Sequence, residues 1–511
     1  MSPVGGPYFI GHDLGTGGDK AVLVDADGRI RSMAFEPVAL DHPRPGWAEQ
    51  DPDAYWTAVC ATTAAVVARA GVAPSEVAGM GFAAQMLTQV PLDASGHPTR
   101  RAISWLDARA EDEAARLVRR LGGQRLVRGV VGAVPSGKDV VAKWAWIRGN
   151  EPEVWQRTTA LTDATGFLVA RATGVLCADH TAGGGTGMID RRRRTWSTPL
   201  LTASGMGRSA RSKLPPLRPC SEVVGGLTPL AAADLGLPVG TPVVAGTGDV
   251  PAAQVGSGAV RVGDAHVCVG TSGWLCVTTD RVADLPAHGV FSLPAADPDT
   301  FATVGEMETA GECLDWLAGV VAGGGDERAV AALVAEAADA PPGAGGLTFA
   351  PWLFGERSPV NDTSLRGAFA GLSLEHTRAH LVRAVLEGVA HNLRWVLEVV
   401  AAKGLGPGRL RVIGGGVRSE VWMQAIADIT GLAVETVAQP QYAGARGAAL
   451  LAAVGTGSLA SVAEVADLVS TDRRFAPTSD RSVAATYDRA HAAFRAMLPA
   501  AKAHATALAG D

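Results

Sequence analysis

The feature that most constrains this 511-residue chain is a pair of similar hairpins, one near its start and one near its middle. In the first, residues 8–14 alternate as a strand, GTGG (15–18) makes the turn, and residues 20–25 form the returning strand. In the second, residues 266–269 lead into GTSG (270–273), and another strand follows. Two such hairpins, each opening one half of the chain, predict a duplicated α/β domain with a nucleotide between the copies.

A single carboxylate, Asp249, stands just before the second hairpin, after an apolar strand (243–245) and the turn Gly-Thr-Gly (246–248). A carboxylate can accept a proton from a hydroxyl, and the backbone N–H groups of a Gly/Thr turn can hold phosphate oxygens. An exposed aspartate is ionised at pH 7. The stretch therefore predicts a phosphoryl-transfer site in which Asp249 acts as an ionised general base.

The first hairpin leaves two interpretations open. It is not a Walker A loop, because it has no GK[ST] and a strand, not a helix, follows it. Its turn can still hold phosphate, with Asp13 orienting a magnesium-bound water beside it. The alternative is an ordinary tight hairpin that Asp13 caps.

Three other stretches allow either a binding or a structural role. Trp105, with Asp107 and Arg109 nearby, offers a flat apolar face and charges for a sugar, or is a half-buried Trp above a surface ion pair. A glycine loop (414–416) before a helix from about 419 to 430 lets a ligand approach the backbone. The small-residue helix at 444–449 can pack closely on a neighbour or on an adenine.

Composition excludes several classes of protein. The length requires two or more domains. With a net charge of -6 and no basic face interleaved with aromatics, we expect no nucleic-acid partner, and we interpret the run RRRR (191–194) as a solvated hairpin turn. The six scattered cysteines show no CxxC, which fits a reducing cytosol and neither zinc nor disulfides. Without a leader pattern or a long apolar run, we expect a cytoplasmic protein with no membrane partner.

Helices are expected at 52–70, with Asp51 as N-cap and Pro52 at the first position, and at 377–403. Residues 151–174 also have a helical pattern, and residues 77–83 read as a strand.

Taken together, the motifs resemble the FGGY carbohydrate kinases, and most closely their xylulokinase-like branch. They run in family order over nearly the whole chain: DLGTGGDK (13–20), GWAEQDPDAYW (46–56), ISWLDARA (103–110), TGDVPAAQVGSG (247–258), VGTSGWL (269–275), LFGERSP (353–359), LRGAFAGLSLEHTRAHLVRAVLEGVA (365–390), IGGGVRSEVWMQAIADITG (413–431) and GARGAALLA (444–452). The resemblance implies an α/β fold of two actin-like ATPase (ribonuclease H-like) domains with an interdomain cleft. It divides the chain into a sugar-binding domain, 1–245, and a nucleotide-binding domain, 246–511.

The resemblance also implies roles for single residues. The acid matching Asp249 takes the proton from the sugar hydroxyl that attacks the γ-phosphate of ATP. Magnesium is expected at Asp249 and, through water, at Asp13. The residues expected around the nucleotide are Gly15, Thr16, Lys20, Gly270, Thr271, Gly311, Asp315, Gly415 and Ser419. Those expected to contact the sugar are Gln85, Met86, Leu87, Trp105, Asp107, Asp249 and Val250.

Two departures from the family pattern concern the substrate. Xylulokinases usually carry Gln-Met-His-Gly where this chain has QMLT (85–88), and Asn where it has Val250. Leu87 and Val250 cannot hydrogen-bond sugar hydroxyls, so the preference for D-xylulose should change. Glycerol kinases carry Arg-Glu at positions 86–87, so glycerol is not expected.

The expected activity is ATP-dependent phosphorylation of a small ketose or polyol, D-xylulose or a related pentulose. Two alternatives stay open. One is a kinase for a tetrulose, another polyol or a sugar acid; the other is a non-catalytic actin-like nucleotide-binding protein. A homodimer is the default expectation for assembly.

Overall fold

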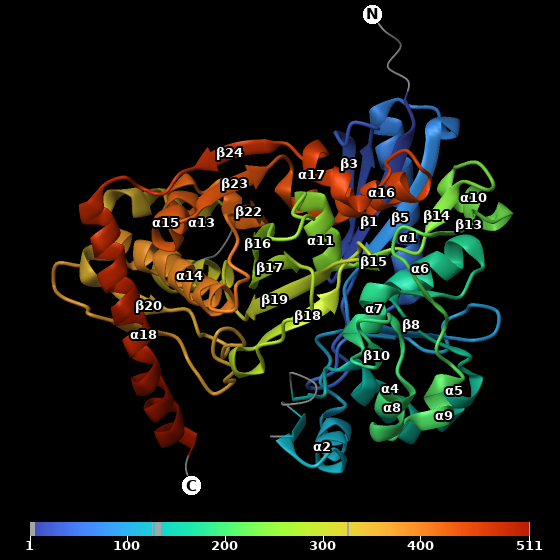
Figure 1. The fold of residues 1–511 in the computed structure, drawn as a ribbon, viewed down its shortest axis with the longest axis horizontal. Coiled ribbons are helices and arrows are strands. Elements are labelled where there is room, and N and C mark those ends of the chain that lie inside the picture. Colours follow the sequence, from blue (N-terminus) through green and yellow to red (C-terminus); the bar gives the residue numbers. More distant parts are fainter. Residues whose placement is uncertain (1–5, 125, 128–133, 324–326, 510–511) are drawn as a thin grey trace, which may run out of the picture.

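The computed structural model describes residues 6–124, 126–127, 134–323 and 327–509. Within these residues two seven-stranded sheets form the two halves of the molecule (Figure 1). The N-terminal sheet has the order β13-β14-β5-β1-β2-β3, with β15 beside β5, and the C-terminal sheet has the order β18-β19-β17-β16-β22-β23-β24.

The strands of the N-terminal sheet are β1 (Tyr8–Gly15), β2 (Gly18–Val24), β3 (Ile30–Pro37), β5 (Val77–Ala84), β13 (Val223–Gly226), β14 (Pro242–Val244) and β15 (Thr247–Gly248). Those of the C-terminal sheet are β16 (Ala265–Val269), β17 (Gly273–Thr279), β18 (Val290–Pro294), β19 (Phe301–Met307), β22 (Arg409–Ile413), β23 (Ala433–Val437) and β24 (Thr471–Phe475). Both predicted hairpins are therefore present.

The two sheets repeat one topology. In the N-terminal sheet, β1, β2 and β3 pair antiparallel, and β5 and β14 then continue parallel to β1. In the C-terminal sheet, β16, β17 and β19 pair antiparallel, and β22 and β23 continue parallel to β16. The strand order thus follows the duplication that the recurring hairpins indicate.

Helices cover both sheets, and the main ones are α1 (Pro52–Ala70), α4 (Val140–Asn150), α6 (Ala164–Thr173), α7 (His180–Gly185), α11 (Asp249–Ser257), α12 (Glu312–Ala322), α14 (Arg378–Ala401), α15 (Glu420–Thr430), α16 (Ala443–Gly455) and α18 (Arg481–Ala509). The predicted start of α1 is confirmed, because the side chain of Asp51 accepts a hydrogen bond from the Asp53 N–H group. Its end is confirmed too, since Gly71 adopts a left-handed conformation with φ of 66°.

Helix α16, from the last quarter of the chain, lies beside β1 and β5 of the N-terminal sheet (Figure 1). Glycines make this close approach possible. A Cβ atom at Gly11 would lie 2.0 Å from the carbonyl oxygen of Ala445, and one at Gly256 of α11 would lie 1.7 Å from that of Ala443. Of the two roles open for the small-residue helix, close packing is the one these contacts document; it joins α11 and α16 to the N-terminal sheet.

The helical pattern at 151–174 is wrong in its middle. The structure has α5 (Pro152–Arg157), then β8 (Ala160–Asp163), then α6. Strand β8 pairs antiparallel with β6 (Gln89–Leu92) in a small sheet with β4 (Glu49–Gln50) and β7 (Ala102–Ile103). A partner far away in sequence therefore decides the conformation of residues 160–163.

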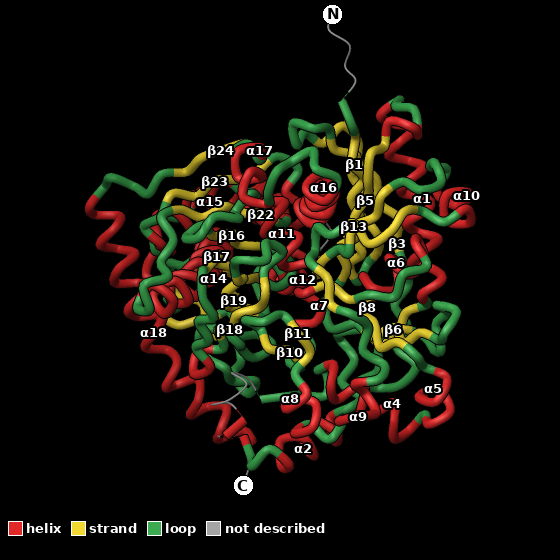
Figure 2. Tube along the Cα trace, turned by 45° about the vertical axis from the view of Figure 1, so that its right-hand side comes forward, coloured by secondary structure: helices red, strands yellow, loops and turns green. Residues whose placement is uncertain are grey.

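The arginine run makes the predicted turn, between β10 (Ile189–Asp190) and β11 (Thr195–Trp196), but the prediction of a solvated turn is wrong for two of its side chains. Figure 2 shows this hairpin beside β18. Arg191 forms an ion pair of 2.6 Å with Asp284. Arg194 is 7% exposed and donates to the carbonyl oxygens of Ala295 and Thr300. The hairpin thus fastens the N-terminal half to the edge of the C-terminal sheet.

Among the residues that the structure describes, none of the helices is both long and apolar enough to cross a membrane.

Candidate active site

Asp249 is the first residue of α11. Strand β15 leads into it, pairing with the end of β5. The Val250 N–H group donates to Asp249 Oδ1 at 2.9 Å, and the backbone of Met86 also hydrogen-bonds to this carboxylate. A Cβ atom at Gly248 would lie 2.5 Å from Met86 Cγ, so only glycine lets the loop after β5 come this close. Backbone groups from the loop after β5 and from the start of α11 therefore hold the carboxylate in one orientation.

The expectation that Asp249 is an exposed, fully ionised acid is wrong. The side chain is only partly exposed, and burial, together with the nearby charge of Asp13, raises its pKa from the ordinary 3.8 to about 7. Burial also raises the pKa of Asp13, although the charge of Lys20 opposes that shift. Asp249 consequently titrates near neutral pH, where a general base is most effective.

Residues predicted from the two hairpins meet beside Asp249. Cys268, at the end of β16, is buried, and burial raises its pKa to about 12. The charges of Lys20, Asp249 and Asp13 also act on this thiol. The turn that begins at Gly270 follows Cys268 after one residue, Val269, so the charges of Asp13 and Asp249 reach the end of the strand that leads into the second turn.

The acidic pair fits a magnesium ion. Asp13 and Asp249 repel each other, and Glu306 of β19 adds a further negative charge near Asp249. A bound cation would offset this repulsion. Magnesium commonly takes one or two protein carboxylates and completes its octahedron with waters and phosphate oxygens. No group of three or more His, Cys, Asp or Glu side chains that could hold a metal ion occurs among the described residues.

The start of α16 closes one side of Asp13. A Cβ atom at Gly444 would lie 2.3 Å from Asp13 Oδ2. Glycine is thus required where the helix meets the carboxylate. No local pattern predicts this contact, because the two residues come from opposite ends of the chain.

The second glycine turn is braced by the start of α12. The Gly311 N–H group donates to the Gly270 carbonyl at 2.7 Å, and the Ala310 N–H group donates to the Thr271 carbonyl at 2.9 Å. A Cβ atom at Gly311 would lie 2.6 Å from the Gly270 oxygen. Three residues predicted to surround the nucleotide are therefore one rigid unit.

The remaining predicted nucleotide residues lie on other elements. A Cβ atom at Gly415 would meet nothing within 4 Å, so the backbone there faces open space that a ligand can approach. Ser419 caps α15, accepting a hydrogen bond of 3.0 Å from the Trp422 N–H group. Asp315 is exposed in the first turn of α12.

On the sugar side, a chain of hydrogen bonds ties the first turn to the loop after β5. Trp105 Nε1 donates to Thr16 Oγ1 at 2.8 Å, and Thr16 Oγ1 donates to Gln85 Oε1 at 3.1 Å. Gln85 Nε2 then donates to Gln50 Oε1 at 2.7 Å, and Tyr55 donates to the same oxygen. The side chain of Thr16, expected at the phosphates, therefore orients Trp105 and Gln85, while Gln50 and Tyr55 are supporting residues that the sequence reasoning missed.

Asp107 has no exposed surface. Its Oδ2 accepts from the Ala48 N–H group at 2.6 Å, and both oxygens accept from the Arg109 guanidinium at 2.9 and 2.7 Å. No carboxylate atom faces a ligand in this conformation. The alternative of an ion pair between Asp107 and Arg109 is therefore present, but it is buried and does not lie on the surface. Contact between Asp107 and a sugar stays a prediction.

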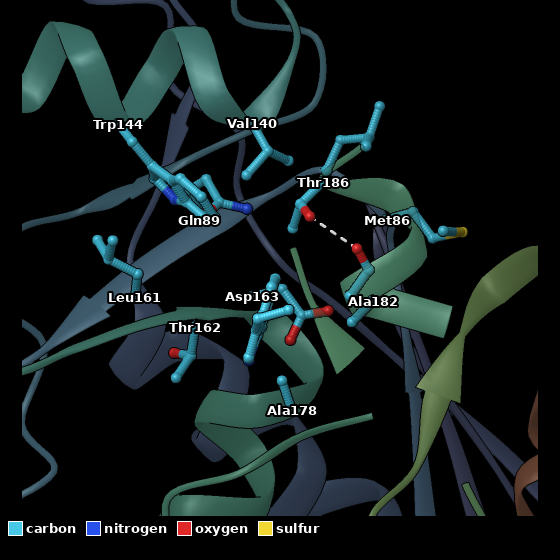
Figure 3. A pocket seen from close by; sticks show the side chains of 13 residues that line it. Met86, Gln89, Val140, Trp144, Leu161, Thr162, Asp163, Ala178, Ala182 and Thr186 are labelled. Atoms are coloured by element: carbon cyan, nitrogen blue, oxygen red, sulfur yellow. Dashed lines mark hydrogen bonds between the residues drawn. The ribbon is translucent and has the colours of Figure 1, made fainter. Parts of the chain in front are cut away.

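Leu87 and Val250, the two departures from the family pattern, have different surroundings. Leu87 has a φ of 63°, which is unusual for a large side chain. With Met86 it lines a cavity of about 20 Å³, enough for one water, that Asp163 and Gln89 also line (Figure 3). Val250 packs against a buried cluster of the C-terminal half made of Cys276, Ala295, Ala302 and Val304.

A second pair of buried carboxylates lies behind the site. Asp163 caps α6 by accepting from the Gly166 N–H group at 2.8 Å, and burial together with the nearby Asp179 raises its pKa to about 7. Asp179 accepts a hydrogen bond from the Thr181 hydroxyl, whose oxygen accepts one from the Gly248 N–H group at 2.8 Å. These hydrogen bonds hold the Thr247–Gly248 peptide, just before Asp249.

Comparison with known proteins agrees with the arrangement. The family model described as "FGGY family of carbohydrate kinases, N-terminal domain" matches residues 8–256, and its C-terminal counterpart matches residues 265–456. The chain belongs to the FGGY family of carbohydrate kinases. The predicted resemblance, the α/β fold class and the assignment as a phosphotransferase acting on an alcohol group are thereby confirmed.

Individual relatives cover almost the whole kinase. The xylulose kinase of Escherichia coli strain K12 is 33% identical over 93% of this chain and 96% of its own. The glycerol kinase of Methylibium petroleiphilum is 32% identical over 94% of this chain and 96% of its own. The crystal structure of xylulose kinase from Rhodospirillum rubrum superposes with a TM-score of 0.87 at 32% identity, covering 98% of this chain and all of its own.

Proposed function

We propose that this kinase transfers the γ-phosphate of ATP to a hydroxyl of a small ketose or polyol, with Asp249 as the general base. One observation supports the proposal: the charges of Asp13 and Asp249 act on each other and on Cys268, two residues before the second glycine turn. A proton acceptor and backbone phosphate donors are the groups that this reaction needs in one place.

Each group then has a task. Asp249 accepts the hydroxyl proton, held in place by the N–H groups of Val250 and Met86. The N–H groups of the two glycine turns hold the phosphates, and Asp13 orients a hydrated magnesium ion. Magnesium, when bound, neutralises charge on the phosphates and helps to align the γ-phosphate.

For the sugar, we place a pentulose first, because several relatives of this chain are named xylulose kinases. Trp105 supplies an apolar face to the sugar. Leu87 and Val250 offer no hydrogen bond, so the preferred acceptor has fewer hydroxyls, or differently placed ones, on the side that faces them. A tetrulose, a polyol or a sugar acid is the alternative, and other relatives are named glycerol kinase and gluconokinase.

A non-catalytic nucleotide-binding role is disfavoured. A protein that only binds ATP does not need a buried carboxylate with a pKa of about 7 that two backbone donors hold in place. We further propose a cytoplasmic location, where ATP is abundant; the homodimer stays a prediction.

The test is acceptor-dependent release of ADP by the full chain with magnesium and ATP, across pentuloses, tetruloses, polyols and sugar acids. We expect release with at least one ketose or polyol, and a phosphorylated product of the matching mass. Release that is the same with and without every acceptor would refute the proposed activity. Release with sugar acids alone would move the assignment to the alternative substrate class.

A further inference from the structure

Lys143 of α4 is a buried amine that belongs to neither the proposed base nor the glycine turns. Its side chain has no exposed surface, and its Nζ donates to the Ser104 carbonyl at 2.8 Å and to the Leu87 carbonyl at 3.2 Å. Burial lowers its pKa to about 7, although the charges of Asp107 and Asp139 favour the protonated form. A buried ammonium is unfavourable unless it is well hydrogen-bonded, so these two carbonyls are its main compensation within the protein.

The two carbonyls belong to the two segments proposed to face the sugar. Leu87 follows Met86 in the loop after β5, and Ser104 precedes Trp105. A second bond joins the same segments, since the Trp105 N–H group donates to Thr88 Oγ1 at 3.2 Å. One ammonium therefore fixes the spacing between the loop and the tryptophan.

The residue after Lys143 holds the first residue of β6, the strand that follows the same loop. Trp144 Nε1 donates to Gln89 Oε1 at 2.7 Å, and Figure 3 shows the two side chains together at the cavity. Consecutive residues of α4 thus hold the loop after β5 at its middle and at its end. Helix α4 is therefore the element that supports the loop proposed to face the sugar.

The conformation of Leu87 explains why a strong donor is needed. With a φ of 63°, its backbone is in a region that large side chains rarely adopt and that persists only where the surroundings impose it. A hydrogen bond from a charged donor is comparable in strength to that strain. On the other side of the same loop, the backbone of Met86 is bonded to Asp249. A relaxation at Leu87 would therefore reach the base.

We propose that Lys143 is a positioning residue for the acceptor sugar: it holds the carbonyls of Leu87 and Ser104 so that the loop after β5, Trp105 and Asp249 keep the spacing that the sugar needs. The inference rests on the proposed kinase function. Helix α4 then takes part in substrate recognition, although neither Lys143 nor Trp144 is expected to touch the substrate.

The kinetic test compares Lys143→Met with Lys138→Met, a control just before the same helix whose charge acts on Lys143 but whose side chain donates to neither carbonyl. For Lys143→Met we expect kcat/KM for the acceptor to fall about 10- to 100-fold, mainly through a higher acceptor KM, while the KM for ATP changes less than about twofold. Lys138→Met should match the wild type. Equal changes in both KM values, or no change in either, would refute a positioning role.

A second measurement does not depend on activity. Hydrogen exchange on the full chain without ligands should be about tenfold faster at residues 85–89 and 104–107 in Lys143→Met than in the wild type or in Lys138→Met. Unchanged exchange there overturns this inference even if the kinase is active. Absence of acceptor-dependent turnover in the wild type, with faster exchange in the variant, would instead overturn only the proposed function. If Lys143→Met does not fold, Lys143→Gln, whose side chain is one bond shorter and uncharged, replaces it in both tests, with changes in the same direction and of smaller size.

Discussion

Asp249 occupies a position where its charged form is disfavoured by burial and by Asp13, and favoured by two backbone donors. The balance leaves its pKa near 7, so at neutral pH a substantial fraction of the carboxyl is ionised and ready to accept a proton. The same arrangement is unfavourable for folding, because the unfolded chain ionises this group without cost. Function and stability are therefore in conflict at this residue.

Asp249→Asn should therefore stabilise the ligand-free protein at neutral and higher pH. The folded pKa of about 7 lies above the ordinary 3.8, so the stability that Asp249 contributes is fully present below about pH 4 and is lost as the pH rises through 7. The variant lacks this loss, and we expect it to be more stable by about 1–3 kcal/mol at pH 8 and equal to the wild type near pH 4. Thermal unfolding at both pH values measures this, and a variant less stable at pH 8 would contradict the pKa.

Leu87 and Val250 should govern which sugar is accepted. Introducing Leu87→His together with Val250→Asn restores two hydrogen-bonding groups, and histidine tolerates a positive φ better than leucine does. We expect kcat/KM for D-xylulose to rise at least about tenfold relative to less hydroxylated acceptors, since one good hydrogen bond is worth about that factor. A steady-state comparison on the acceptor panel checks this; an unchanged order of preference would show that these residues do not face the sugar.

At the scale of single residues, sequence alone predicted the acids and the glycine turns, because each carries its chemistry in a local motif. It missed the supporting residues. Gln50, Tyr55 and Thr181 act through partners far away in sequence, which no local pattern reveals. Lys143 did leave a signal: it is a lysine inside the apolar run VVAKWAWI, where a charged side chain has no solvent-facing side to occupy.

At the scale of the elements, α11 and α16 approach each other very closely, and they can do so because glycine has no side chain at the contact. Gly256→Ala would place a Cβ atom 1.7 Å from the Ala443 carbonyl oxygen, so the two helices must separate. We expect a loss of about 2–4 kcal/mol of stability, as overpacking into a rigid backbone contact requires. Denaturant unfolding of Gly319→Ala is the control: a Cβ there meets nothing within 4 Å on helix α12, so this change should be neutral or slightly stabilising. Equal effects of both substitutions would contradict the close contact.

Elements held by local interactions were predictable from the sequence, and those held by distant partners were not. The hairpins and α1 follow from turn and capping residues within a few positions of each other. Strand β8 was taken for helix because its conformation depends on pairing with β6, about seventy residues earlier in the chain. The glycine contacts of α16 were visible only as an abundance of small residues.

At the scale of the whole molecule, two junctions between the halves matter most among the residues that the structure describes. The first junction is the packing of α11 and α16 against β1 and β5, and the second is the β10–β11 hairpin, whose arginines donate to β18 and to the segment between β18 and β19. Any closing of the two halves on substrate must leave both junctions intact. The motion we expect is therefore a rotation about them, which keeps water from the γ-phosphate.

Arg194→Met should weaken the second junction. Arg194 donates to the carbonyls of Ala295, Asp297 and Thr300 and is 7% exposed, so its loss leaves buried acceptors without partners. We expect a loss of about 2–4 kcal/mol in thermal or denaturant unfolding. The matched change Arg192→Met, at an exposed position of the same turn, should have little effect. If the two variants unfold alike, the hairpin is not a structural junction.

The central claim is that Asp249 takes the proton from the sugar hydroxyl while the two glycine turns hold the nucleotide. The most direct test is kcat for the preferred acceptor in Asp249→Asn, with magnesium and ATP at saturation. Loss of the base should lower kcat about 10³-fold, because the proton acceptor is removed while the turns that hold the phosphates are untouched. A variant that keeps a tenth or more of the wild-type kcat would show that another group accepts the proton.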